Sequence, residues 1–313
     1  MTGSRRAFLL LLTLVIASGF VDFRIRQYPS HPFETYIPGV IDGTYGAPGI
    51  YRVLVPYSNT WLAEWTGWPP SSVWHISRLG WFLVAYLAFF RYLRTWFTVE
   101  ASLAGVAAVA ATLPLTYTNS WAHPDSIPEL ALFTLGCLAI VRGSDVGLAV
   151  VLPLALLNRE TAAFLVLTYV VAVPANRRRL VRAAGFTAIA AGVLLSLRAW
   201  RGVEHYDYWQ LGRNLAFLGL LPANYDLYKR AYAWFIVALT APALAVIAAG
   251  WPYVPAIARR LLASAVPLVV TAVTLSSLIE TRIFLPIYPL VMPALMWAVL
   301  QPRRSNEESS FAN

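Results

Sequence analysis

Residues 146–174 read VGLAVVLPLALLNRETAAFLVLTYVVAVP, two apolar runs interrupted by Asn158, Arg159 and Glu160. A bilayer core about 30 Å thick takes roughly 20 helical residues, and each run is shorter than that. A single crossing over 146–174 would place the charges at mid-membrane, where ionised side chains are costly. We therefore predict a helical hairpin whose recessed tip, 158–161, forms the floor of a pocket, because irregular backbone at such depth needs a protein-lined cavity.

The composition of the whole chain is that of a membrane protein. Hydrophobic residues make up 58% of the 313 residues, charged residues 12%, and the mean hydropathy is +0.60, whereas soluble domains carry about 25% charged residues. The net charge of +9 does not indicate nucleic-acid binding, because the basic residues stand in short clusters beside apolar spans. We predict one all-α, polytopic integral-membrane domain over 1–313.

Apolar runs that alternate with polar breaks divide this domain into about ten predicted transmembrane helices. Their ranges are 7–21, 76–93, 97–117, 127–141, 146–158, 161–174, 183–199, 231–250, 261–279 and 283–300. With Arg5 and Arg6 inside, the run Arg177–Arg179 and the tail 301–313 also lie inside, as the positive-inside rule predicts. The expected location is the plasma (inner) membrane, with several passes and both termini cytoplasmic.

Two long loops, 22–75 and 200–230, lie on the outer side in this topology and are expected to carry short amphipathic helices. In the first loop Trp61, Trp65 and Trp68 follow helical spacing, so this segment should lie in the headgroup layer and end at Pro69-Pro70. All four histidines and most of the 15 carboxylates fall on the same side. This asymmetry predicts an active site that faces away from the cytosol.

Three outer aspartates are candidate catalytic groups. Asp22 follows the first span in GFVDFRIR, where a partly desolvated carboxylate suits a general base; the alternative is an ordinary interfacial aspartate. Asp42 in VIDGTYGAPG lies in a glycine-rich turn, where aspartate also serves local hydrogen bonding. Asp125 in NSWAHPDSIPEL is either a site residue or the cap of the following helix.

Arginines and polar groups at the helix mouths are candidate substrate-binding residues. Arg52 in IYRVLVP either pairs with a phosphate through two hydrogen bonds or extends to the headgroups. The remaining candidates lie at the outer ends of spans: His123, Asn158, Arg159, Glu160, Glu280 and Arg282. Charges recessed in a membrane are functional candidates by default, although Arg159 and Glu160 could also simply pair with each other. No spacing defines a metal site.

The chain resembles the GT-C superfamily of integral-membrane glycosyltransferases, in particular small uncharacterised bacterial members. The resemblance rests on an acidic residue soon after the first span, here Asp22 with Asp42 as the fallback, and on a second acid in the next outer segment, Asp125 in HPDSIPE. The strings YRVLVP, LNRET and ETRIFLPIYPL also look like those of such proteins. An Asp-x-Asp motif is absent from the sequence, so a divalent cation (Mg or Mn) is compatible with the resemblance but not required by it.

The resemblance implies transfer of a sugar from a polyprenyl-phosphate donor to a lipid, glycan or protein acceptor on the outer face. It implies that Asp22 acts as base on the acceptor hydroxyl, and that Arg159 and Arg282 stabilise the departing phosphate. His123 and Asp125 would bind sugar hydroxyls or the phosphate, and Glu160 would hold Arg159. The implied partners are the lipid-linked sugar, the bilayer and the acceptor.

Two other functions fit a polytopic protein with these features. A transporter or lipid flippase would use Asn158, Arg159 and Glu160 as a relay, and it requires a polar path to the cytoplasmic side. The predicted spans 97–117, 231–250 and 261–279 are nearly free of charge, which disfavours such a path. A non-catalytic scaffold of envelope assembly would instead use the tryptophan-rich segment as a docking surface.

Overall fold

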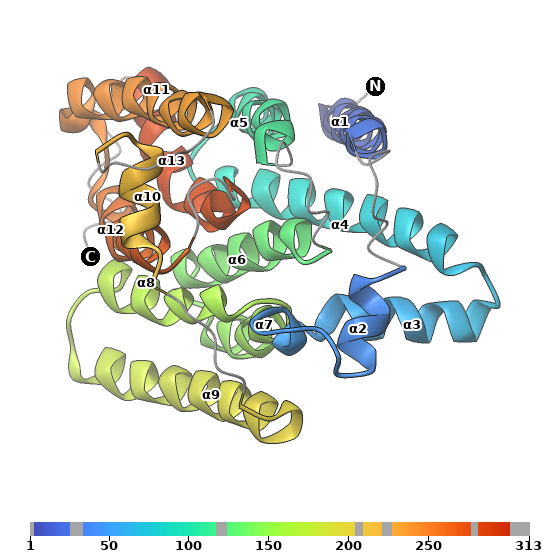
Figure 1. Ribbon diagram of the computed structural model, residues 1–313. Coiled ribbons are helices and arrows are strands. Elements are labelled where there is room, and N and C mark those ends of the chain that lie inside the picture. Colours follow the sequence, from blue (N-terminus) through green and yellow to red (C-terminus); the bar gives the residue numbers. More distant parts are fainter. Residues whose placement is uncertain are drawn as a thin grey trace.

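The computed structural model describes residues 3–25, 34–116, 124–203, 209–220, 227–276 and 281–300, and these ranges contain helices and turns but no strand (Figure 1). The all-α class predicted from the sequence is therefore confirmed. Apolar runs of this kind form helices because an α-helix satisfies its interior backbone groups within the segment itself. The predictions that concern His123, Glu280, residues 204–208 and 221–226 of the loop 200–230, and the tail 301–313 lie outside the described residues.

The helices follow one another in a single chain of α and short 3₁₀ (η) elements. Their bounds are α1 Gly3–Ile25, α2 Tyr36–Ile41, η1 Gly49–Tyr51, α3 Leu54–Thr66, α4 Pro70–Leu93, α5 Val99–Thr112, η2 Leu113–Thr116, α6 Ser126–Val141, α7 Asp145–Asn158, η3 Glu160–Ala163, α8 Phe164–Ala172, α9 Arg177–Arg201, α10 Leu211–Phe217, α11 Leu227–Ala249, η4 Trp251–Tyr253, α12 Ala256–Leu275, η5 Thr281–Ile287 and α13 Tyr288–Leu300.

Four segments among the described residues are long and apolar enough to cross a membrane. They are Pro70–Leu93, Arg177–Arg201, Ala256–Leu275 and Ile283–Leu300. The predicted count of about ten spans is not supported on this criterion, although each predicted range overlaps a helix. For α5, α6, α7 and α8 the reason is length: a helix of 14 residues such as α7 is about 21 Å long, shorter than a hydrocarbon core of about 30 Å.

The predicted hairpin is confirmed as a break between α7 and α8. Arg159 has extended backbone angles, φ −163° and ψ 137°, and separates the end of α7 from η3. At the other end of α7, Asp145 pairs with Arg182 in the second turn of α9, with 2.7 Å between Oδ2 and Nη1. Because α8 leads directly into α9, α8 returns to the level where α7 began. The continuous crossing over 146–174 is therefore excluded.

These contacts define two ends of the bundle. We call the end that carries Asp125 and Asn158 the tip end, and the end that carries Asp145 and Arg182 the opposite end. Asn158 at the end of α7 is bonded to Asp125 at the start of α6, so α6 and α8 run away from the tip end while α7 and α9 run toward it. Consequently α7 and α9 are parallel neighbours.

Helix α9 begins earlier than the predicted span 183–199. The Asn176 side chain accepts a hydrogen bond of 2.7 Å from the backbone N–H of Arg179, which caps the helix and satisfies one of its free N–H groups. The cluster Arg177–Arg179, predicted as part of a loop, therefore forms the first turn. In Figure 1, α9 lies along one edge of the molecule, with α7 and α8 on one side of it only.

The centre of the fold is α6, which packs against α4, α7 and α8 (Figure 1). Nearly all residues of α6 are buried. Gly136 allows α8 to approach closely, because a Cβ atom at this position would lie 2.6 Å from Leu165 side-chain atoms. Small residues at helix contacts are typical of membrane bundles. The tip of the hairpin thereby lies against the first turn of α6.

The tryptophan-rich segment of the first outer loop forms α3, as predicted. The indoles of Trp61 and Trp65 are stacked, with ring centroids 5.9 Å apart, and are 64% and 73% exposed. The helix does not end at Pro69-Pro70, however. It ends at Thr66, because Gly67 adopts a left-handed conformation with φ +67°, and Pro70 instead begins α4, where its missing N–H is tolerated.

Candidate functional site

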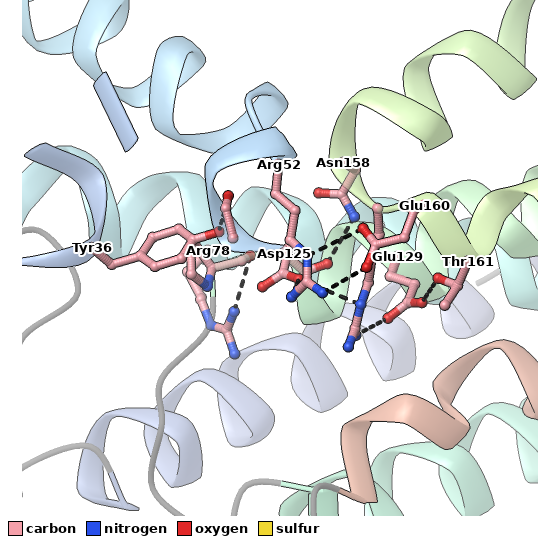
Figure 2. A network of polar contacts seen from close by, with 11 residues as sticks. Tyr36, Arg52, Arg78, Asp125, Glu129, Asn158, Glu160 and Thr161 are labelled. Carbon is pink, nitrogen blue, oxygen red and sulfur yellow. Dashed lines mark hydrogen bonds and ion pairs between the residues drawn. The ribbon is translucent and has the colours of Figure 1, made fainter. Parts of the chain in front are cut away.

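A buried network of charged side chains lies at the tip end (Figure 2). Arg52, which follows η1 in the first outer loop, reaches across to the helical hairpin. Its Nη1 donates to Asp125 Oδ2 at 3.0 Å, and its Nη2 and Nε donate to the two carboxylate oxygens of Glu160 at 2.9 and 3.4 Å. This single guanidinium therefore joins the outer loop, the start of α6 and the hairpin tip.

Arg159 forms the second half of the network. Its Nη1 donates to Glu129 Oε2 at 2.5 Å, and its Nε lies 3.6 Å from Asp125 Oδ2. The other oxygen of Glu129 accepts a hydrogen bond of 2.5 Å from the Thr161 hydroxyl. The resemblance implied that Glu160 holds Arg159, but their principal partners are different: Glu160 holds Arg52, and Glu129 holds Arg159.

Asp125 lies between the two arginines. It occupies the N-cap position of α6, but its side chain makes no capping hydrogen bond and pairs with Arg52 instead, so the capping interpretation is wrong. Its backbone carbonyl accepts a 2.9 Å hydrogen bond from the Asn158 side chain. The interpretation of Asp125 as part of a site with Arg52, Asn158 and Arg159 is therefore the one that the geometry favours.

A second buried ion pair lies beside the network. Arg78 of α4 donates from Nε and Nη2 to the two oxygens of Asp22 at 3.0 and 3.1 Å, and its guanidinium carbon lies 5.7 Å from the centroid of the Trp74 ring. Arg78 also donates to the carbonyl of Pro124 at 3.5 Å. The pair thus ties α1 and α4 to the segment that carries Asp125.

The network carries three carboxylates against two guanidinium groups, a formal excess of one negative charge. Asp125 is 1% exposed, and Arg52, Glu129 and Arg159 are also buried. The Glu160 side chain is different, because 38% of it is exposed. Glu160 is therefore the carboxylate of this network that a substrate can reach most readily.

Two groups of the first outer loop show the electrostatic effect of the network. Burial by itself lowers the pKa of Arg52, but the Glu160 and Asp125 carboxylates outweigh burial and raise that pKa well above its ordinary value. Burial raises the pKa of the Tyr36 phenol, and the nearby Asp125 carboxylate raises it further. Arg52 therefore stays charged and Tyr36 stays protonated over the physiological pH range.

The structure brings five of the predicted site residues together. They are Arg52, Asp125, Asn158, Arg159 and Glu160. Asp22 lies in the adjacent ion pair, whereas Asp42 is exposed at the C-terminal end of α2. Arg282 belongs to η5, but its side chain, like His123 and Glu280, lies outside the described part of the chain.

Sequence reasoning missed Arg78 and Tyr36 as parts of this region. Arg78 was detectable, because it is the lone charge near the start of the predicted span 76–93, and charges within apolar spans are functional candidates. Tyr36 had no such signal, since it lies in a loop whose path the sequence does not reveal. Among the described side chains no group of three or more His, Cys, Asp or Glu could hold a metal ion, and the network carboxylates already bind arginine. This arrangement does not fit an Mg or Mn site.

A cavity of about 560 Å³ lies beside the hairpin tip, between α7 and α9. Its lining is almost wholly apolar and consists of Leu157, Ala188, Ile189, Gly192, Val193, Ser196, Leu197 and Trp200. The tip was predicted to form the floor of a pocket. This cavity instead begins one residue before the tip, at Leu157, while Asn158 and Arg159 are buried in the ion network.

Comparison with known proteins gives no relative: no family model, no curated protein and no solved structure matches the chain. Two features of the tip end bear on function. One is a buried, negatively charged network with an accessible carboxylate. The other is an apolar groove whose lining residue Leu157 immediately precedes Asn158 of the network.

Proposed function

We propose that the protein is a membrane glycosyltransferase that moves a sugar from a polyprenyl-phosphate donor to a lipid, glycan or protein acceptor. The observation that carries the proposal is the position of Glu160. Its carboxylate is partly exposed, belongs to a network with two arginines, and lies three residues from Leu157 in the apolar groove. An acid, cations and a lipid-accessible groove are the groups that such a transfer needs.

The proposed membrane arrangement has about ten crossings, in the plasma membrane, with both termini cytoplasmic and the tip end outside. What supports it is that each of the ten predicted ranges overlaps a helix, and that α1 and α11 have 23 residues each. The shorter helices α6, α7 and α8 would cross as parts of a packed bundle. Exposed arginines at the opposite end agree with a cytoplasmic location.

In the proposed reaction the acceptor hydroxyl attacks the anomeric carbon of the donor sugar. The bond between that carbon and the phosphate oxygen breaks, its electron pair leaves with the polyprenyl phosphate, and the hydroxyl proton passes to Glu160. A single displacement inverts the anomeric centre. Arg52 orients the Glu160 carboxylate through its two hydrogen bonds, and the negative charge that develops on the departing phosphate requires a cation whose charge carboxylates do not already offset.

The aspartates then have supporting roles. Asp22 is only 4% exposed and is paired with Arg78, whereas the Glu160 side chain is partly exposed, so we assign Asp22 to positioning rather than to proton transfer. Asp125 is almost inaccessible and orients the two arginines. Asp42, being exposed, is the alternative base.

The two competing functions find different support. The exposed tryptophans of α3 favour a scaffold with a docking surface. Transport is disfavoured, because the core below the network is filled by large apolar side chains such as Phe82, Phe89 and Phe133. A polar path across the described residues would have to pass through this cluster.

The test uses the purified protein in nanodiscs with a panel of polyprenyl-phosphate sugars and host lipid extract. We expect wild type to release free polyprenyl phosphate, detected by mass spectrometry. Glu160→Gln should lower the rate at least ~100-fold, the usual contribution of a general base. Asp145→Asn, the same change in an ion pair at the opposite end, should leave the rate unchanged.

Three results would change the proposal. Full activity of Glu160→Gln together with inactivity of Asp42→Asn would move the base to Asp42. Equal loss in Glu160→Gln and Asp145→Asn would indicate a general effect on folding, which thermal unfolding of both variants would reveal. Wild type that is folded but releases nothing from any donor would exclude the transferase and leave the scaffold as the better function.

A further inference from the structure

The groove between α7 and α9 runs along two adjacent rows of α9, and Ile189, Val193 and Leu197 form one of them. Ala188, Gly192, Ser196 and Trp200 succeed one another at intervals of four residues, so they lie on one helix face. The stripe from 188 to 200 is about 18 Å long. Only Leu157 lines the groove from α7. The groove is therefore elongated and open toward the surroundings of the bundle, a shape that suits a hydrocarbon chain.

Gly192 forms the middle of the groove. A Cβ atom built on Gly192 would meet no heavy atom within 4 Å, and the same is true of Gly185, two helical turns earlier. At Gly192 this free space belongs to the groove, whereas Gly185 does not line it. A large side chain at position 192 would therefore occupy the groove without a clash with the fold.

The positively charged side chain of Arg201 lies where the groove reaches the tip end. The guanidinium carbon of Arg201 lies 4.0 Å from the centroid of the Trp200 ring, which lines the groove. Arg201 donates to the Tyr57 hydroxyl and, at 3.4 Å, to the carbonyl of Ile41. These partners are neutral, and within the described side chains Arg201 forms no ion pair with a carboxylate. Its charge thus differs from those of Arg52 and Arg159, which carboxylates offset.

The end of the groove also adjoins the charged network. Leu157 immediately precedes Asn158 and Arg159. Leu197 packs in the small core of the first outer loop with Val53, the neighbour of Arg52. The Tyr51 hydroxyl donates to the carbonyl of Gly202 at 3.0 Å, which holds η1 against the end of α9. A chain in the groove would consequently bring its head group to Arg201, next to the elements that carry Arg52 and Glu160.

We propose that this groove binds the hydrocarbon chain of a polyprenyl phosphate and that Arg201 binds its phosphate. The inference rests on the proposed function and deepens it, since it assigns the site of the lipid donor and of the lipid product. We assign the groove to a single-chain lipid, because its lining is one elongated, mostly apolar strip made of two adjacent rows of α9 and the facing Leu157. A phosphate complements a guanidinium that no described carboxylate neutralises.

Binding is measured without any sugar, by native mass spectrometry of the intact detergent-purified protein. The probes are undecaprenyl phosphate, undecaprenol and phosphatidylglycerol, each titrated separately. We expect wild type to bind undecaprenyl phosphate at least tenfold more tightly than either other lipid. Gly192→Leu should weaken this binding at least tenfold, and Gly185→Leu, the matched change outside the groove, should alter it less than twofold.

The phosphate contact is tested with a second pair of variants. Arg201→Gln should reduce the affinity for undecaprenyl phosphate to that for undecaprenol, and Arg198→Gln, an exposed arginine in the same last turn, should have a smaller effect. If Gly192→Leu lowers the thermal unfolding midpoint, Ala188→Phe is tested in its place. The new side chain obstructs the same groove from another position. Loss of binding in that folded variant supports the proposal, and unchanged binding overturns it.

Other outcomes overturn the groove site directly. One such outcome is equal affinity of Gly192→Leu and Gly185→Leu for undecaprenyl phosphate. Another is a wild-type affinity for phosphatidylglycerol equal to that for undecaprenyl phosphate, which would make the groove a site for bulk lipid. A failure of the proposed function alone gives a different result. In that case wild type binds undecaprenyl phosphate in the groove but releases none from any donor. Conversely, release that persists in Gly192→Leu would leave the transferase intact and exclude this groove.

Discussion

Arg52 and Glu160 are 108 positions apart in the chain and are joined by two hydrogen bonds, Nη2 to Oε1 at 2.9 Å and Nε to Oε2 at 3.4 Å. This pair fastens the first outer loop onto the hairpin tip. Because the same guanidinium also holds Asp125, the loop, α6 and the hairpin form one unit at the tip end. The stability of that unit should therefore depend on Arg52 more than on any exposed arginine.

Arg52→Ala is expected to lower the free energy of unfolding by about 3–5 kcal/mol, the usual cost when one partner of a buried ion pair is removed. Asp125, which is 1% exposed, would lose its 3.0 Å partner. Arg52→Lys should lower the free energy of unfolding by less, because the positive charge remains although the two-point contact with Glu160 does not. Equilibrium unfolding measures the free energy of unfolding of both variants. Arg182→Ala, in the half-exposed pair with Asp145, is the control and should change stability by less than about 1 kcal/mol.

Asp22 and Arg78 should behave as a coupled structural pair. Asp22→Asn and Arg78→Gln are each expected to destabilise the protein by about 3 kcal/mol, and the double variant by clearly less than their sum. A double-mutant cycle of unfolding free energies measures the coupling. If Asp22→Asn instead abolished polyprenyl-phosphate release with no loss of stability, Asp22 would be the base and its assigned positioning role would be wrong.

Stability at alkaline pH should depend in part on Tyr36. Its pKa in the folded protein is raised by burial, so the folded state keeps the phenol proton more strongly than the unfolded state does. The contribution of Tyr36 is fully present below about pH 10, the ordinary tyrosine pKa, and is lost as the pH rises above that value. Unfolding midpoints between pH 8 and pH 11 should fall less steeply for Tyr36→Phe than for wild type. Parallel slopes would contradict this prediction.

The orientation of the bundle can be tested with single cysteines. Cys137 is fully buried, so a maleimide should not reach it. In intact cells a membrane-impermeant maleimide should label Ser72→Cys at the tip end, whereas Arg178→Cys at the opposite end should be labelled only after permeabilisation. The reverse pattern would place the network on the cytoplasmic side, and labelling of both positions in intact cells would contradict a membrane-spanning arrangement.

Gly250 should be intolerant of a side chain. A Cβ atom there would lie 2.4 Å from the Cβ and 2.5 Å from the Cα of Ala298 in α13, and backbone atoms cannot move aside as a flexible side chain can. Gly250→Ala is expected to destabilise the protein by about 1–3 kcal/mol. Gly185→Ala, with open space around its Cβ position, should be neutral or stabilising by up to about 1 kcal/mol. Thermal unfolding of the two variants provides the comparison.

The helices and the class of protein were predictable because their signals are local. A run of apolar residues determines a helix by its own backbone hydrogen bonds, and the break at Arg159 follows from charges that cannot remain in lipid. Errors arose where a neighbouring residue set the boundary. Asn176 extends α9 by capping it, and Gly67 ends α3 before the two prolines.

The sequence by itself therefore determined an all-helical, membrane-type chain with a hairpin tip at 158–161 and acids gathered with arginines at one end. Only the tertiary structure decided the pairing: Glu129, not Glu160, is the main partner of Arg159, Arg78 holds Asp22, and the groove lies beside the tip. The physical reason is that an ion pair depends on the rotation of each helix about its axis and on the path of a loop. Packing between distant segments sets both the helix rotation and the loop path. Neither can be predicted from the residue pattern of any one segment.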